Sequence, residues 1–86
     1  LPTHAFEVQI RGNFYEALTK LKHAFDRWNC TPVLITTEKF QEEAKQLLEG
    51  SFHEMKETAR IIDWRKIQTL HELERRLRNI KNEIGL

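Results

Sequence analysis

The first pattern in the chain is an alternation of apolar and polar residues near its start. Phe6, Val8 and Ile10 are separated from one another by single polar residues. A period of two is typical of a strand with one buried face. Residues 5–10 are therefore either a short strand or an irregular segment, and the pattern alone does not decide between them.

A helix is predicted directly after this segment. Asn13 and Glu16 have the three-residue spacing of a capping box, in which each side chain binds a free backbone amide of the first turn. Apolar residues then recur at alternating spacings of four and three until Asn29 and Pro32 interrupt the pattern. The apolar face, which we expect to be buried, consists of Phe14, Leu18, Leu21, Phe25 and Trp28.

The middle of the chain contains a short apolar run and a second predicted helix. The run covers residues 33–36 and is too short for its periodicity to distinguish a strand from a buried loop. The second helix is predicted to start at Thr36 or Thr37 and to end at Gly50, a residue that tolerates the conformation of a helix C-terminus. Its apolar face consists of Phe40, Ala44, Leu47 and Leu48.

The last segment contains neither proline nor glycine between Phe52 and Ile84. Nothing in its composition interrupts a helix, so one long helix is predicted over about residues 52–84, with a length of roughly 45 Å. The three helices predict a mostly α fold, a small three-helix bundle forming one domain over residues 1–86. Short strands over residues 5–10 and 33–36 remain optional additions to it.

The C-terminal part of this helix has a regular apolar repeat with spacings of three and four residues. Such a repeat is typical of a helix that packs along another helix. Intrachain packing on the first helix would explain most of the repeat, but that helix is shorter, at about 24 Å. An uncovered remainder would mark a partner-binding surface. The predicted partner-binding residues are Leu70, Leu73, Leu77, Ile80 and Ile84.

The charged residues leave two interpretations of this same helix open. The formal net charge of +1 provides no general attraction to nucleic acid or to an acidic membrane. Four basic residues nevertheless lie close together and could contact phosphates or an acidic protein surface. They are Arg75, Arg76, Arg78 and Lys81. The simpler interpretation is a solvated face with intrahelical ion pairs, such as Glu72 with Arg76 and Glu74 with Arg78.

No pattern in the sequence indicates a catalytic, metal or cofactor site. No two of the four histidines (His4, His23, His53 and His71) have the four-residue spacing that places two ligands on one helix face. The three glycines are isolated, so no phosphate-binding loop is predicted. Cys30 is the only cysteine, which excludes an intramolecular disulfide and favours a reducing, intracellular compartment. No apolar stretch is long enough to cross a membrane.

These observations predict a protein without enzymatic activity. We expect an adaptor-like protein–protein interaction module or a small structural subunit of a complex. It would dock or self-associate through its amphipathic C-terminal helix, in the manner of a coiled coil, and its partner would be a helix of another protein or a second copy. The alternative is a subunit of a nucleoprotein complex, in which the basic residues of that helix contact RNA or DNA phosphates. The amphipathic helices match several families of small helical modules about equally well and assign the chain to none of them.

Overall fold

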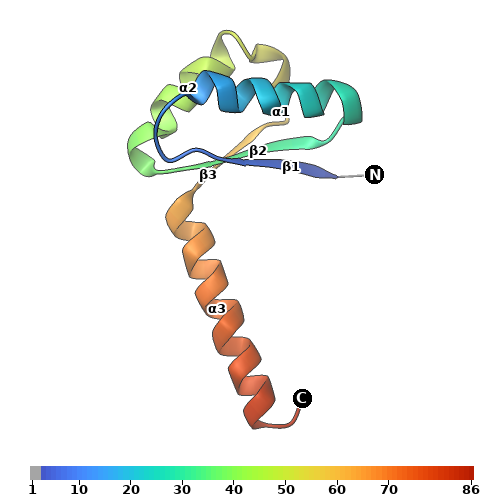
Figure 1. The fold of residues 1–86 in the computed structure, drawn as a ribbon, viewed down its shortest axis with the longest axis vertical. Coiled ribbons are helices and arrows are strands. Elements are labelled where there is room, and N and C mark those ends of the chain that lie inside the picture. Colours follow the sequence, from blue (N-terminus) through green and yellow to red (C-terminus); the bar gives the residue numbers. More distant parts are fainter. Residues whose placement is uncertain (1–2) are drawn as a thin grey trace.

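The computed structural model describes residues 3–86 and has a mixed α/β architecture (Figure 1). The elements are β1 (His4–Val8), α1 (Phe14–Trp28), β2 (Thr31–Thr36), η1 (Glu38–Phe40), α2 (Gln41–Glu49), η2 (His53–Met55), β3 (Arg60–Asp63) and α3 (Trp64–Glu83). The three strands form one parallel sheet in the order β1-β2-β3. The predicted three-helix bundle is therefore wrong, although most of the chain is helical.

The two segments for which the sequence left the choice open, residues 5–10 and 33–36, both contribute strands. β1 pairs with β2 so that Phe6 lies opposite Val33 and Val8 lies opposite Ile35. The pairing extends past β1, because the Gln9 backbone N–H donates to the Ile35 carbonyl at 2.9 Å. β2 is the central strand, so its backbone groups are paired on both sides.

The prediction of one helix over residues 52–84 is wrong in its first third. This stretch contains the short helix η2, a turn and then β3, before α3 begins at Trp64. β3 pairs with β2, with Ile61 opposite Leu34 and Ile62 opposite Ile35. The absence of proline and glycine permits a helix without requiring one. Two adjacent β-branched isoleucines beside an unpaired strand edge favour the sheet.

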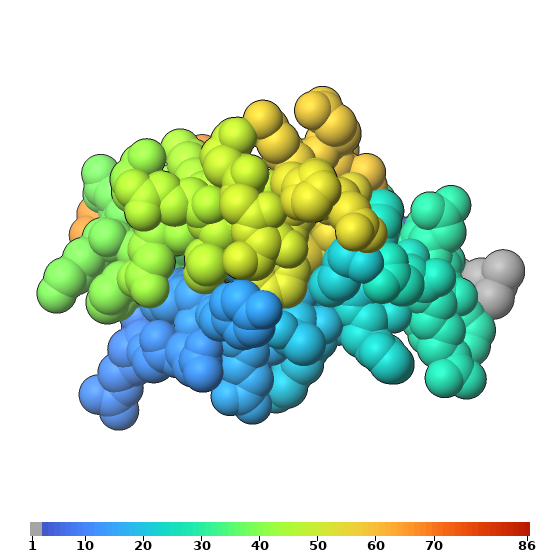
Figure 2. Space-filling model, turned by 90° about the horizontal axis from the view of Figure 1, so that it is seen from above, coloured from blue at the N-terminus to red at the C-terminus, as the bar shows by residue number. Residues whose placement is uncertain are grey.

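α1 and α2 lie side by side on one face of the sheet (Figures 1 and 2). The predicted start of α1 is confirmed, because the Asn13 side chain accepts a hydrogen bond from the Glu16 N–H at 3.0 Å. Trp28 was expected to be buried but remains exposed at the last residue of α1. The buried cluster between these helices and the sheet consists of Phe14, Ala17, Leu18, Leu21, Leu34, Ala44, Leu48, Phe52 and Met55.

α3 projects from the sheet on the side opposite α1 and α2 (Figure 1). The molecule is 51 Å long in its longest dimension and has a radius of gyration of 15.8 Å. A compact domain of this chain length has a radius of gyration of about 12 Å. The difference arises because α3, with 20 residues, extends about 30 Å away from the body.

Candidate protein–protein interface

The predicted apolar repeat forms an exposed stripe along the projecting helix. Its five side chains are each between 53% and 65% exposed, and no residue of α3 is buried. We call this surface the α3 stripe; it consists of Leu70, Leu73, Leu77, Ile80 and Ile84. A continuous apolar strip of this length is unusual on the surface of a soluble protein and is typical of binding sites.

The connection between β3 and α3 determines that the α3 stripe stays uncovered. β3 ends at Asp63 and α3 begins at Trp64, so no loop residues are available to turn the helix back onto the sheet. Asp63 caps the helix, since its Oδ1 accepts a hydrogen bond from the Arg65 N–H at 2.8 Å. The expectation that packing on the first helix accounts for most of the stripe is wrong, because α1 packs on the other face of the sheet.

Charged residues flank the α3 stripe on both sides. With 3.6 residues per turn, Glu74 and Lys81 lie along one side of the stripe. Arg76 and Glu83 lie along the other side. Each side therefore carries one acidic and one basic residue, seven positions apart. In paired helices, residues at such positions contact the partner helix and influence its orientation.

The four basic residues predicted to contact phosphates spread around the helix. Arg75 lies on the side away from the stripe, and its Nη2 donates to Glu72 Oε1 at 2.8 Å. Arg76 lies 3.9 Å from the same carboxylate oxygen, which is one of the two intrahelical pairs expected from the sequence. Neither Arg78 nor Lys81 forms an ion pair within residues 3–86.

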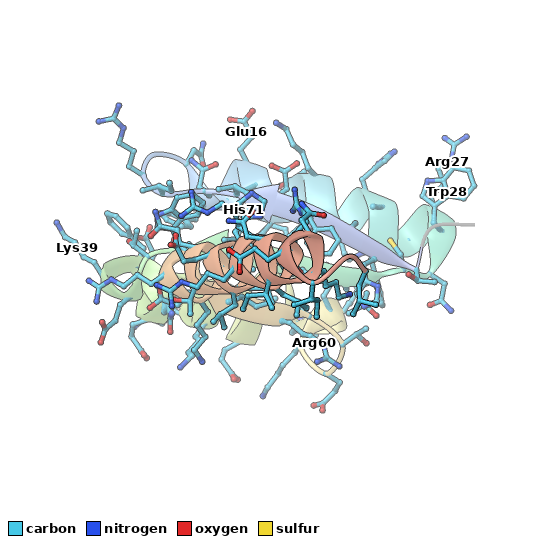
Figure 3. All side chains as sticks on the ribbon, turned by 90° about the horizontal axis from the view of Figure 1, so that it is seen from below. Glu16, Arg27, Trp28, Lys39, Arg60 and His71 are labelled. Atoms are coloured by element: carbon cyan, nitrogen blue, oxygen red, sulfur yellow. The ribbon has the colours of Figure 1, made fainter. Side chains whose placement is uncertain are left out.

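Figure 3 views the molecule from the side of the sheet that α1 and α2 leave open, with α3 in front. A second exposed apolar surface lies on the edge strand β1. Phe6 is 61% exposed and Val8 is 52% exposed. The strand register places them beside Val33 and Ile35 of β2, which are themselves buried, so the exposed apolar surface is confined to the edge strand β1. Sequence reasoning missed this surface. Its signal was the uninterrupted apolar run of β2, which is typical of a parallel strand whose sheet is covered on both faces.

A shallow depression of about 330 Å³ lies between α2 and β3, away from α3. Its lining includes the apolar side chains of Leu48 and Ile61, and the charged groups around them include Glu49 and Lys56. Lys56 Nζ lies 2.7 Å from Glu49 Oε2, and this hydrogen bond raises the pKa of Lys56 above its ordinary value. The two charged groups therefore satisfy each other. Lys45 is the remaining charged side chain of the lining, and a single lysine does not form a convergent set of polar groups for a ligand.

The described residues do not assemble a catalytic or metal-binding cluster. No group of three histidine, cysteine, aspartate or glutamate side chains in residues 3–86 is arranged to hold a metal ion. The histidines lie on β1, α1, η2 and α3. Cys30 is buried, and its thiol donates to the Ala24 carbonyl at 3.5 Å. In the same part of the chain, none of the helices is both long and apolar enough to span a membrane.

Comparison of the chain with protein-family models, with characterised proteins and with solved structures finds no match. The candidate site therefore rests on the geometry of the chain itself.

Proposed function

We propose that this protein is a non-enzymatic interaction module or small structural subunit that associates with another helix through the α3 stripe. The observation that carries this proposal is the exposure of all five apolar side chains of the stripe on a helix that projects away from the body. Burial of each leucine or isoleucine contributes about 1.5–3 kcal/mol relative to full exposure. Because these side chains are already about half covered, the available gain is roughly half of that per residue.

Association would also contribute to the stability of the projecting helix. Most helical stability in proteins comes from tertiary packing of an apolar face, and α3 has 20 residues with none of them buried. Within residues 3–86 the body supplies such packing only near the start of α3, where Ile67 is partly buried. Association along the α3 stripe would supply packing for the remainder.

The alternative function, contact with RNA or DNA phosphates, has weaker support in the arrangement of the side chains. Two of the four predicted phosphate contacts, Arg75 and Arg76, lie against Glu72. The remaining pair, Arg78 and Lys81, is a small basic surface for a chain with a net charge of +1. Binding to a mixed-sequence RNA or DNA duplex that weakens steeply with salt would favour this alternative over helix association.

The proposed function is tested by combining solution mass with amide hydrogen exchange. Light scattering is measured across a concentration series for the native chain, for Leu77→Asp and for Arg78→Asp. The last variant is the control, because it also introduces an aspartate, one position away from the stripe. Association that Leu77→Asp abolishes and Arg78→Asp preserves supports the proposal.

The proposal is contradicted if the α3 stripe is covered by its own chain. In that case the chain would be a monomer at all concentrations, and the amides of α3 would exchange as slowly as those of α1. The proposal would also be wrong if the native chain associates and Leu77→Asp associates equally well.

A further inference from the structure

The charged residues beside the α3 stripe discriminate between the ways in which two copies of the helix can pair. In a helix pair, the residues that flank the apolar seam of one helix face flanking residues of the other. On α3 these residues are Glu74 and Lys81 on one side, and Arg76 and Glu83 on the other. Opposite charges in facing positions favour an arrangement, and like charges disfavour it.

A parallel, in-register pair of α3 helices is disfavoured. In this arrangement a residue on one side of the seam faces the residue five positions later on the second helix. Arg76 would therefore lie against Lys81 of the second copy, and the twofold symmetry would repeat this repulsion on the other side. Glu74 would face Thr69, which offers no compensating charge.

One antiparallel register matches every flanking charge with its opposite. It places Leu73 against Ile84 of the second copy and Leu77 against Ile80, so that four apolar layers form along the seam. In the same register Glu74 faces Lys81 of the second copy. On the other side of the seam Arg76 faces Glu83.

The neighbouring antiparallel register, shifted by one heptad, is disfavoured by the same rule. It would pack Leu70 against Ile80 and would also form four apolar layers. However, it places Glu74 against Glu74 of the second copy and Arg76 against Arg76. The apolar repeat alone therefore permits both registers, and the flanking charges select one of them.

We propose that α3 binds α3 of a second copy of this chain in the antiparallel register that pairs Glu74 with Lys81 and Arg76 with Glu83. The proposal rests on the proposed function, which it deepens by naming the partner. The arrangement is a closed twofold dimer. Because each helix projects from its own body, the two sheets with their α1 and α2 helices lie at opposite ends of the helix pair.

The test measures the dimer dissociation constant by sedimentation equilibrium for the native chain and for charge variants. Lys81→Glu should weaken the dimer about tenfold, since it turns two attractive contacts per dimer into repulsive ones. Lys81→Glu combined with Glu74→Lys should restore the native dissociation constant, because the exchanged charges again face their opposites. Arg75→Glu is the matched control, because it makes the same charge change on the side of α3 away from the stripe.

The other arrangements give different results in the same experiment. A parallel dimer would be strengthened by Lys81→Glu, because that change relieves the repulsion from Arg76. The shifted antiparallel register would not be weakened by Lys81→Glu, since Lys81 would face the uncharged Ile67. A dimer formed through the open sheet face would dissociate on Phe6→Asp and would not respond to the charge exchange. Each of these results would overturn the inference.

The failure of this inference is distinguishable from failure of the proposed function. A chain that remains monomeric, with α3 amides that exchange rapidly, would show that a second copy is not the partner. In that case the stripe would still be exposed, and the proposed function would stand with a partner helix from another protein. A monomer whose α3 amides are protected would contradict both.

Discussion

The Asp63 carboxylate accepts a hydrogen bond from the Arg65 backbone N–H at 2.8 Å, at the point where β3 ends and α3 begins. The same residue is the last member of the β2–β3 ladder, opposite Thr36. Asp63 therefore belongs to the sheet through its backbone and to the helix through its side chain. α3 therefore starts directly at the end of β3, with no loop between the two elements.

Loss of the Asp63 cap should loosen α3 while leaving the body folded. Asp63→Ala removes the acceptor for the Arg65 amide in the first turn of the helix, at an expected cost of about 1 kcal/mol in helix stability. Asp63→Asn is the control, because asparagine caps a helix about as well as aspartate. Amide exchange in α3 should accelerate in the alanine variant alone. Equal exchange in both variants would show that the cap does not hold the helix.

Core and stripe leucines should differ in their effect on folding. Leu18 is buried between α1 and the sheet, so Leu18→Ala should reduce the free energy of unfolding by about 2–5 kcal/mol. Leu73 is exposed, so Leu73→Ala should change it by less than about 0.5 kcal/mol. Both are measured by urea unfolding in the Leu77→Asp background, which removes association. A large loss in the Leu73 variant would mean that the stripe packs on its own chain.

The protein should become more stable when Thr36 is replaced by valine. The Thr36 side chain is fully buried, and its Oγ1 has no hydrogen-bond partner within the described part of the chain. A buried hydroxyl without a partner costs free energy, so Thr36→Val should raise the free energy of unfolding by about 1 kcal/mol. Thr31→Val, at the partly exposed start of the same strand, should be nearly neutral. If Thr36→Val is destabilising, the hydroxyl has a polar partner that the valine removes.

The stability of the fold should decline at alkaline pH through Lys22. Hydrogen bonds to Asp26 and then to Glu54 raise the pKa of Lys22 above its ordinary value of 10.5. The contact with Glu54 also ties α1 to η2, the short helix after α2. A raised pKa means that the contribution is complete below pH 10.5 and disappears as the pH rises through the pKa of the folded state. The effect is small because the groups are solvated.

Lys22→Met should therefore flatten the alkaline part of the stability profile. The free energy of unfolding is measured on both sides of pH 10.5 for the native chain, for Lys22→Met and for Lys20→Met. Lys20 is the control, since it lies exposed on the same helix and forms no ion pair within residues 3–86. A native profile that does not change with Lys22→Met would show that this lysine makes no net contribution.

Local patterns in the sequence were sufficient to predict features that depend on residues close together in the chain, such as helix ends and amphipathic helix faces. The spacing of Asn13 and Glu16 identified the start of α1, and Gly50 marked the end of α2. The spacing of the α3 stripe identified the amphipathic face of the last helix. These features arise from contacts within one or two turns, so they are readable along the chain.

Only the tertiary structure decided that the chain forms a sheet and that α3 projects from it. β3 exists because Ile61 and Ile62 pair with a strand that lies far away in the sequence, and no local pattern in residues 52–63 indicates that pairing. The exposure of the α3 stripe follows from the direct connection at Asp63 and from α1 packing on the other face of the sheet. The sequence alone determined which residues are apolar, whereas the fold determined which of them stay uncovered, because burial depends on segments that meet only after folding.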